Sequence, residues 1–181
     1  GAWFIEKKLC DDIESYFEKL PSDLKRDGLT GSNEVNKSHK DSIDINLKGW
    51  EITYPFGDYQ KQLGNCLSLY EKKFNDVKML DRFSLGEEGY NVQKYKAGGG
   101  FKVWHCERNN LNQCSRVLVF MTYLNDVKDG GTFFKYQNIK IPAKKGLTLI
   151  WPSDWTHTHK GEISKTKEKF IVTGWLSFLK E

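Results

Sequence analysis

The spacing of apolar residues in the first half of the chain predicts two amphipathic helices. The first carries apolar side chains at helical spacing and stops before Pro21: Leu9, Ile13, Tyr16, Phe17 and Leu20. A second apolar stripe runs over residues 58–74. The polar, glycine-containing stretch between them, residues 22–50, favours a loop or an irregular arm. The pattern therefore predicts a mostly helical support over residues 1–85.

From about Tyr90 the pattern changes to short apolar runs rich in β-branched and aromatic residues, which predict strands. These runs cover residues 117–124, 139–142, 146–151 and 169–178. The Asp-Gly-Gly segment at residues 129–131 is typical of a turn. Short strands separated by glycine turns favour an antiparallel sandwich or jelly roll. The predicted fold class is mainly β with flanking helices, in one domain over residues 1–181 with its core in residues 86–181.

Composition places the chain among globular domains. Its 181 residues are enough for one domain with a sizeable core, and 38% are hydrophobic and 14% aromatic. No apolar run is long enough to span a membrane, and the first residues lack the pattern of a signal peptide. The four cysteines show no CxxC spacing, which favours reduced thiols and a cytoplasmic location.

The charge of +4 is modest, but lysines are dense over residues 135–145 and 160–169. A solvated lysine-rich face explains them, and so does a patch for an acidic partner or nucleic acid.

Two short segments about fifty residues apart, one at His105–Glu107 and one at His157–His159, contain the candidate metal ligands. On a strand, His105 and Glu107 would point to the same side, because residues two apart share a face. A third ligand must come from a distant strand, where His157 and His159 are the candidates. They are expected to share a strand face for the same reason, so their own spacing does not choose between them. Two histidines and a carboxylate suit non-haem Fe(II) oxygen chemistry.

The last predicted strand adds a possible anion site. Lys169, Ile171, Thr173 and Trp175 alternate onto one face of that strand. If this face lines the interior, a lysine there requires an anionic partner, since an unpaired buried charge is costly. A bound carboxylate would supply that partner through charge-assisted hydrogen bonds.

The candidate ligands lie within a longer order of motifs. In chain order these are Tyr95, Gly98-Gly99-Gly100, Trp104-His105-Cys106-Glu107, Arg116, Tyr123-Leu124-Asn125, Gly130-Gly131-Thr132, Trp151-Pro152, His159 and Lys169. Over roughly residues 88–178, this order resembles the 2-oxoglutarate- and Fe(II)-dependent dioxygenases, specifically their prolyl 4-hydroxylase-like branch. The resemblance implies a double-stranded β-helix, the cupin-like form of the jelly roll.

The resemblance also implies roles for individual residues. His105 matches the first iron ligand, and Glu107 lies where this branch usually has aspartate; other branches use H-x-E. His159 matches the distal ligand because it lies ten residues before the basic Lys169. The residues matching those at the 2-oxoglutarate site are Lys169, Thr173, Tyr123 and Tyr95. Trp175, Trp104 and His157 are expected to face the substrate. Arg116 matches a family position, and a structural salt bridge is the default for it.

The implied activity is hydroxylation of a substrate C–H bond with Fe(II) and 2-oxoglutarate, releasing succinate and CO2, with ascorbate as an aid. A prolyl residue in a peptide is one candidate substrate, and a free amino acid, another side chain or a small molecule are others. The alternative is a non-catalytic jelly-roll module that has lost iron and binds a partner through its basic face. Nucleic-acid demethylation is disfavoured, since that branch resembles an arginine-bearing pattern. A monomer or homodimer without membrane contact is expected.

Overall fold

The computed structural model describes residues 1–31 and 34–179. Its helices are α1 (Lys7–Lys19) and α2 (Phe56–Lys73), with short 3-10 turns η1 (Ser22–Leu24), η2 (Asn75–Met79), η3 (Leu111–Gln113) and η4 (Trp155–His157). Its strands are β1 (Ala2–Phe4), β2 (Arg26–Asp27), β3 (Lys40–Asp41), β4 (Ile43–Leu47), β5 (Phe83–Tyr95), β6 (Gly100–Phe101), β7 (Arg116–Tyr123), β8 (Val127–Phe134), β9 (Ile139–Ala143), β10 (Leu147–Pro152), β11 (His159–Gly161) and β12 (Lys169–Phe178).

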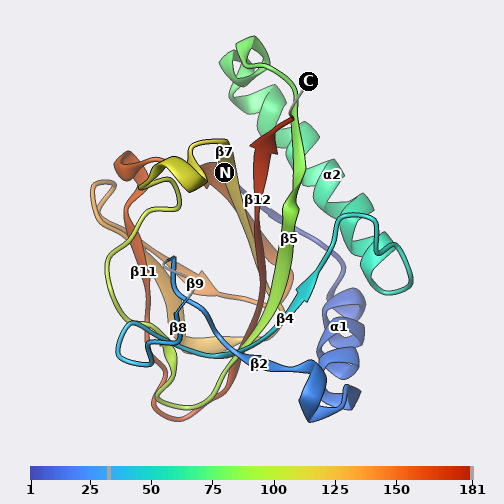
Figure 1. Ribbon diagram of the computed structural model, residues 1–181, viewed down its shortest axis with the longest axis vertical. Coiled ribbons are helices and arrows are strands. Elements are labelled where there is room, and N and C mark those ends of the chain that lie inside the picture. The colour runs from blue at the N-terminus through green and yellow to red at the C-terminus, as the bar shows by residue number, and fades with distance from the viewer. Residues whose placement is uncertain (32–33, 180–181) are drawn as a thin grey trace.

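A large antiparallel sheet forms the main wall of the molecule. Its strand order is β1-β10-β7-β12-β5-β4-β2, and a smaller sheet, β11-β8-β9, lies opposite it. A further pair joins β3 to β6. Figure 1 shows α1 and α2 on the outer side of the large sheet, away from β8, β9 and β11. The prediction of a mainly β fold with flanking helices is confirmed.

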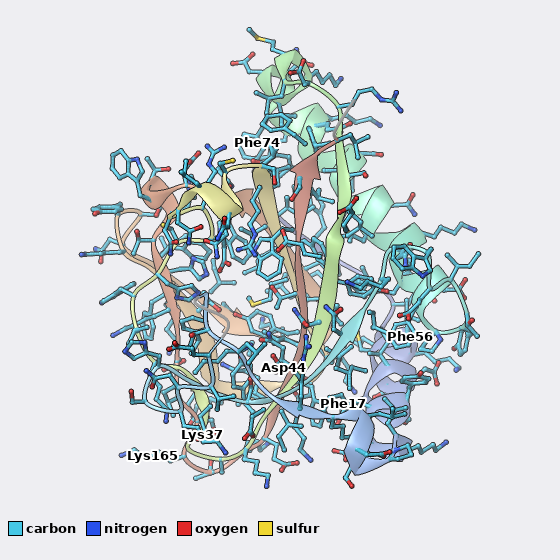
Figure 2. All side chains as sticks on the ribbon, viewed as in Figure 1. Phe17, Lys37, Asp44, Phe56, Phe74 and Lys165 are labelled. Carbon is cyan, nitrogen blue, oxygen red and sulfur yellow. The ribbon has the colours of Figure 1, made fainter. Side chains whose placement is uncertain are left out.

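The alternation along β12 explains how the two layers of the core form. Phe170, Val172 and Leu176 pack in the core beneath the helices, whereas Ile171 and Trp175 belong to the core between the two sheets. Helix side chains complete the outer core, since Phe17 and Phe56 belong to that same cluster and lie on its helical side in Figure 2. The inner face of β12 is thereby left to line a cavity between the sheets.

The expectation for the first 85 residues is wrong in one respect. Residues 22–50 were expected to form a loop, but Ile43–Leu47 is strand β4, which pairs with β5 inside the large sheet. Its apolar residues alternate over only five positions, and polar segments flank them, so the strand signal is short. Strand β1 also joins the large sheet, through β10. Ser32 and Asn33 of the expected loop lie outside the described residues.

The expected turn at residues 129–131 is also wrong. Gly130 and Gly131 lie within strand β8. A Cβ on Gly131 would lie too close to the Ile141 carbonyl oxygen of β9, and a Cβ on Gly130 would crowd Val127. The glycines therefore serve close approach between chain segments rather than a change of direction.

Substitution of these glycines has a measurable consequence. We expect Gly131→Ala to lower the free energy of unfolding by about 1–3 kcal/mol, because β9 must move to admit the methyl group. Gly64 in α2 is the matched control, since a Cβ there meets nothing within 4 Å. Gly64→Ala should raise the free energy of unfolding by roughly 0.5–1 kcal/mol. Urea unfolding of both variants checks the pair; equal effects would contradict the close-approach explanation.

Neither α1 nor α2, nor any other helix in the described ranges, has the length and apolar character needed to cross a bilayer.

Candidate metal centre

A cavity of about 590 Å³ lies between the two sheets. Eight of the ten candidate site residues line it together: Tyr95, His105, Glu107, Tyr123, His159, Lys169, Thr173 and Trp175. These residues come from β5, β7, β11, β12 and the segment before η3. Folding therefore brings the predicted metal ligands and the predicted anion site into one cavity.

The three candidate ligands converge within this cavity. Oε1 of Glu107 lies 3.2 Å from Nε2 of His105 and 3.5 Å from Nε2 of His159. One ligand atom from each residue lies within 4.8 Å of the others. A single small cation in their midst would contact all three.

Hydrogen bonds to the backbone fix which imidazole nitrogen is available. Nδ1 of His105 lies 3.1 Å from the Val103 carbonyl oxygen, and Nδ1 of His159 lies 2.9 Å from that of His157. A carbonyl oxygen can only accept, so each Nδ1 carries a proton, and Nε2 is the nitrogen that is turned toward Glu107 and could bind a metal. Metal-binding histidines commonly have this arrangement, in which the second nitrogen orients the ring.

Charge and burial favour the ligand forms of these side chains. Burial opposes ionisation of Glu107, but hydrogen bonds from His105 and His159 outweigh it and hold its pKa well below the usual range. Burial, and then the neighbouring His105, lower the pKa of His159. A divalent cation binds an anionic carboxylate and deprotonated imidazole nitrogens, and the lowered pKa values of Glu107 and His159 favour these forms.

The local structure around the ligands differs from the expected strand. His105 and Glu107 lie in an irregular segment that His105 joins to His159 through an isolated bridge. Main-chain hydrogen bonds run both ways, from His105 N to His159 O (3.0 Å) and from His159 N to His105 O (2.9 Å). The amide of Glu107 donates to the Ser153 carbonyl oxygen. Long-range backbone contacts, rather than strand alternation, thus bring these side chains together.

The structure separates His157 from the ligand group. Its ring belongs to the 3-10 turn η4, and its Nδ1 lies 3.1 Å from the Thr156 hydroxyl. The expectation that His157 and His159 share a strand face is therefore wrong. Among the described residues, the side chains grouped for metal binding are His105, Glu107 and His159. His157 contributes its backbone carbonyl, which orients the ring of His159.

Lys169 is a buried cation in the wall of the same cavity. Only 5% of its surface is exposed, and Nζ donates to the carbonyl oxygens of Gly130 (2.9 Å) and Glu162 (3.1 Å). Within residues 1–31 and 34–179, no carboxylate oxygen lies within 4 Å of this ammonium. Burial lowers its pKa to about 8. Among the described residues the ammonium therefore has no directly paired carboxylate, and the charges of Glu162 and Asp129 offset its burial only in part.

Hydroxyl-bearing side chains line the same cavity as the lysine. The Tyr123 hydroxyl lies 2.6 Å from that of Thr132, and both residues line the cavity. Thr132 was missed as a site residue because its role depends on β7 of the large sheet and β8 of the small sheet facing the same cavity. The Tyr95 ring lies 5.3 Å from Lys169 Nζ, and its hydroxyl donates to Gln93. A carboxylate beside Lys169 would be near further hydrogen-bond donors.

Three further residues named in the sequence analysis, Trp175, Arg116 and Thr173, form hydrogen bonds or ion pairs in the wall of the cavity. Nε1 of Trp175 donates to Oε2 of Glu107 at 2.9 Å, a contact that no sequence pattern predicted. Arg116 forms the salt bridge expected for it, with Glu88 (2.5 Å). The Thr173 hydroxyl donates to the Phe120 carbonyl oxygen at 3.0 Å. Trp175 therefore contacts a candidate ligand directly, in addition to lining the cavity.

Trp104 and Gln113 differ in exposure. Trp104 is 42% exposed, and Lys160 Nζ lies 4.7 Å from its ring centre. Gln113, which the sequence reasoning missed, is buried at the cavity wall, and within the described residues its Oε1 has no hydrogen-bond partner. In Figure 2 the cavity-wall residue Asp44 lies toward the middle of the molecule, whereas Lys37 and Lys165 lie at its periphery.

The donor set fits Fe(II). Two neutral imidazoles and one carboxylate on one side of a metal, with the opposite side open, form the facial triad of non-haem Fe(II) oxygenases. The buried ammonium of Lys169, which no carboxylate of the described residues pairs directly, fits a co-substrate that carries a carboxylate. Comparison with known proteins gives the same result: the profile of the 2OG-Fe(II) oxygenase superfamily matches residues 90–177. These residues form a 2OG-Fe(II) oxygenase domain. The superfamily uses Fe(II) and 2-oxoglutarate.

A curated relative of this oxygenase domain is a plant protein. The chain is 27% identical over 139 residues to "Probable prolyl 4-hydroxylase 9" of Arabidopsis thaliana, which covers 61% of this chain. The chain spans about half of that relative, 47% of its length.

Solved structures of prolyl hydroxylases share the fold. A viral collagen prolyl hydroxylase from Paramecium bursaria Chlorella virus 1, in complex with 2-oxoglutarate, has a TM-score of 0.71 at 17% identity. The match covers 99% of this chain and 96% of the viral one. A Trichoplax adhaerens prolyl hydroxylase in complex with a peptide of hypoxia inducible factor has a TM-score of 0.74 at 16% identity, covering 98% of this chain and 83% of that one. The oxygenase domain thus has the double-stranded β-helix expected from the sequence.

Proposed function

We propose that this chain is an Fe(II)- and 2-oxoglutarate-dependent hydroxylase that acts on a C–H bond of a peptide substrate, with prolyl residues as the first candidates. One observation supports it above the others: the converging His105, Glu107 and His159 share a cavity with the buried ammonium of Lys169, which no carboxylate of the described residues pairs directly. A binding module without iron has no use for such a pairing of sites. Prolyl peptides are favoured because the relatives named above are prolyl hydroxylases.

Iron and 2-oxoglutarate, when bound, supply the oxidising power that turns substrate C–H into C–OH, with succinate and CO2 as by-products. The protein contributes binding and orientation. His105, Glu107 and His159 would hold the metal. Lys169 would pair with a carboxylate of the co-substrate, in a cavity that Tyr123 and Thr132 also line.

Enclosure is the second contribution of the protein. Lys169, Tyr123 and His159 are each at least nine-tenths buried, so few water molecules compete for the charges in the cavity. Excluding water strengthens the contact between the ammonium and a carboxylate, and it protects reactive species from side reactions.

The test of the proposal has two stages. Anaerobic titration with Fe(II) and 2-oxoglutarate should give the weak visible charge-transfer band, and admission of oxygen should yield succinate. Mass spectrometry of proline-containing peptides after incubation with iron, ascorbate and 2-oxoglutarate should then show a gain of one oxygen atom. Absence of both the band and succinate would support the alternative, a binding module that has lost iron. If succinate formed but no peptide gained oxygen, the oxygenase activity would stand and the tested peptides would be excluded as substrates.

The pKa of Lys169 predicts how co-substrate affinity depends on pH. Burial lowers this pKa from 10.5 to about 8, so Nζ is charged below pH 8 and becomes neutral above it. Since a carboxylate pairs with the charged form, 2-oxoglutarate affinity should be highest below pH 8 and fall above it. The limiting decrease is about tenfold per pH unit.

Lys169→Arg provides the control for this prediction, because guanidinium stays charged throughout this range. Calorimetric titration of the Mn(II)-loaded proteins with 2-oxoglutarate from pH 7 to 9 should show the decrease in the wild type alone. Equal slopes in the two proteins would place the titrating group elsewhere, for example on the metal.

A further inference from the structure

The two carboxylate oxygens of Glu107 have different surroundings. Oε1 faces Nε2 of both His105 and His159, at 3.2 and 3.5 Å. Oε2 points away from them and accepts a hydrogen bond from Nε1 of Trp175 at 2.9 Å. Only 14% of the side chain is exposed, so water competes little for either oxygen. One oxygen is therefore available to a metal, while an indole N–H holds the other.

Arg116 holds Trp175 in this position. Its guanidinium carbon lies 3.6 Å from the ring centre of Trp175, which is close stacking. The same guanidinium donates through Nη1 to the backbone carbonyl oxygen of Glu107 at 2.9 Å, and Nη1 lies 3.7 Å from Oε2. One side chain thus fixes both the backbone of the ligand residue and the indole that contacts its carboxylate.

Arg116 is in turn fixed by a bulge in β5. The pairing of β5 with β12 shifts register between Gly174 and Leu176, where the partner changes from Tyr90 to Leu85. The extra residues include Glu88, which binds Arg116 through Nε (2.9 Å) and Nη2 (2.5 Å). The bulge needs Gly89, whose φ of +72° disfavours other residues. Bulges of this kind re-aim side chains beside active sites.

The side chain of Glu107 is long enough to need a partner that restricts its carboxylate. Glutamate is one methylene longer than aspartate and has an extra rotatable bond, so its carboxylate can swing and bind a metal through both oxygens. A carboxylate bound in that way would occupy one more metal position, at the expense of co-substrate or oxygen. A partner that holds one oxygen removes this freedom.

We propose that Trp175, held by Arg116, is a positioning residue for the iron site: its indole N–H retains Oε2 of Glu107 so that Oε1 alone meets the metal. The inference rests on the proposed function for the identity of the metal. It adds why a glutamate works at a position where the prolyl 4-hydroxylase-like branch usually has aspartate. The geometry to be tested is the contact between Trp175 and Glu107, rather than the bulk of the indole.

Trp175→Phe tests this contact, because phenylalanine retains an aromatic face for Arg116 but lacks the N–H. We expect Mn(II) affinity, measured by calorimetry without oxygen, to fall about tenfold, in the range for lost hydrogen bonds to metal ligands. The visible band of the anaerobic Fe(II)–2-oxoglutarate complex should also shift, because the released Oε2 can approach the metal. Trp104→Phe is the matched control, since that exposed indole has no hydrogen bond to a candidate ligand among the described residues.

A double-mutant cycle separates positioning from packing. Glu107→Asp shortens the side chain and withdraws the carboxylate from the indole, so adding Trp175→Phe to it should cost no further Mn(II) affinity. Equal losses in the two backgrounds, or no loss and no band shift from Trp175→Phe alone, would overturn the positioning role while leaving the proposed function intact. A wild-type protein that binds neither Mn(II) nor Fe(II) would overturn both.

Discussion

Replacement of His159 by alanine is expected to abolish both metal binding and succinate formation. The variant removes one of the three side chains whose ligand atoms converge within 4.8 Å. The imidazole is 7% exposed, and water in the space it leaves is a poorer ligand than imidazole nitrogen. The loss should exceed about a hundredfold in metal affinity, the upper range for groups that merely orient ligands.

His157→Ala is the matched control, two residues away. It removes an imidazole that lies in turn η4, outside the ligand group, and it retains the backbone carbonyl that orients His159. Metal affinity should change little, and turnover should fall only modestly. Calorimetry with Mn(II) and a succinate assay give both quantities. If His157→Ala were the more damaging change, the assignment of His159 as a ligand would be wrong.

Lys169→Ala should increase the 2-oxoglutarate concentration required for half-maximal binding by about a hundredfold, or roughly 3 kcal/mol. The reason is that a buried carboxylate would lose its charge-assisted partner and gain no water in its place. Metal binding should be nearly unchanged, because Lys169 donates to Gly130 and Glu162 rather than to the metal ligands.

Lys140→Ala controls for a general loss of positive charge. Lys140 pairs with the Glu162 carboxylate at 2.7 Å, and its side chain is 41% exposed. Lys140→Ala therefore removes a nearby positive charge without opening the cavity, and the affinity for 2-oxoglutarate should stay close to the wild-type value. Titration of the Mn(II)-loaded variants with 2-oxoglutarate decides the matter. Equal weakening in both variants would show that overall charge, rather than a specific anchor, governs binding.

Elements with a long and regular pattern could be predicted from the sequence. The alternation from Lys169 to Phe178 gave both the limits of β12 and the face that lines the cavity. The apolar stripe of α2 gave that helix to within two residues. Both signals are local, because the side chains that face one way recur at a fixed interval along the chain.

Features created by contacts between distant segments could not be predicted in this way. Strand β4 is short, and its place in the sheet depends on β5 rather than on its own five residues. Gly130 and Gly131 looked like a turn because glycine also marks turns, whereas here it admits a neighbouring strand. The bonds from Trp175 to Glu107 and between Tyr123 and Thr132 exist only once separate strands have come together.

The paired main-chain hydrogen bonds between His105 and His159 bear on how the protein responds to loss of the metal. They set the separation of the two imidazoles through the backbone, so the site is assembled by folding and not by the metal. Zinc fingers behave in the opposite way, since they unfold when the metal leaves. We therefore expect the fold to persist when the metal is removed, so that the metal-free protein can take up iron again.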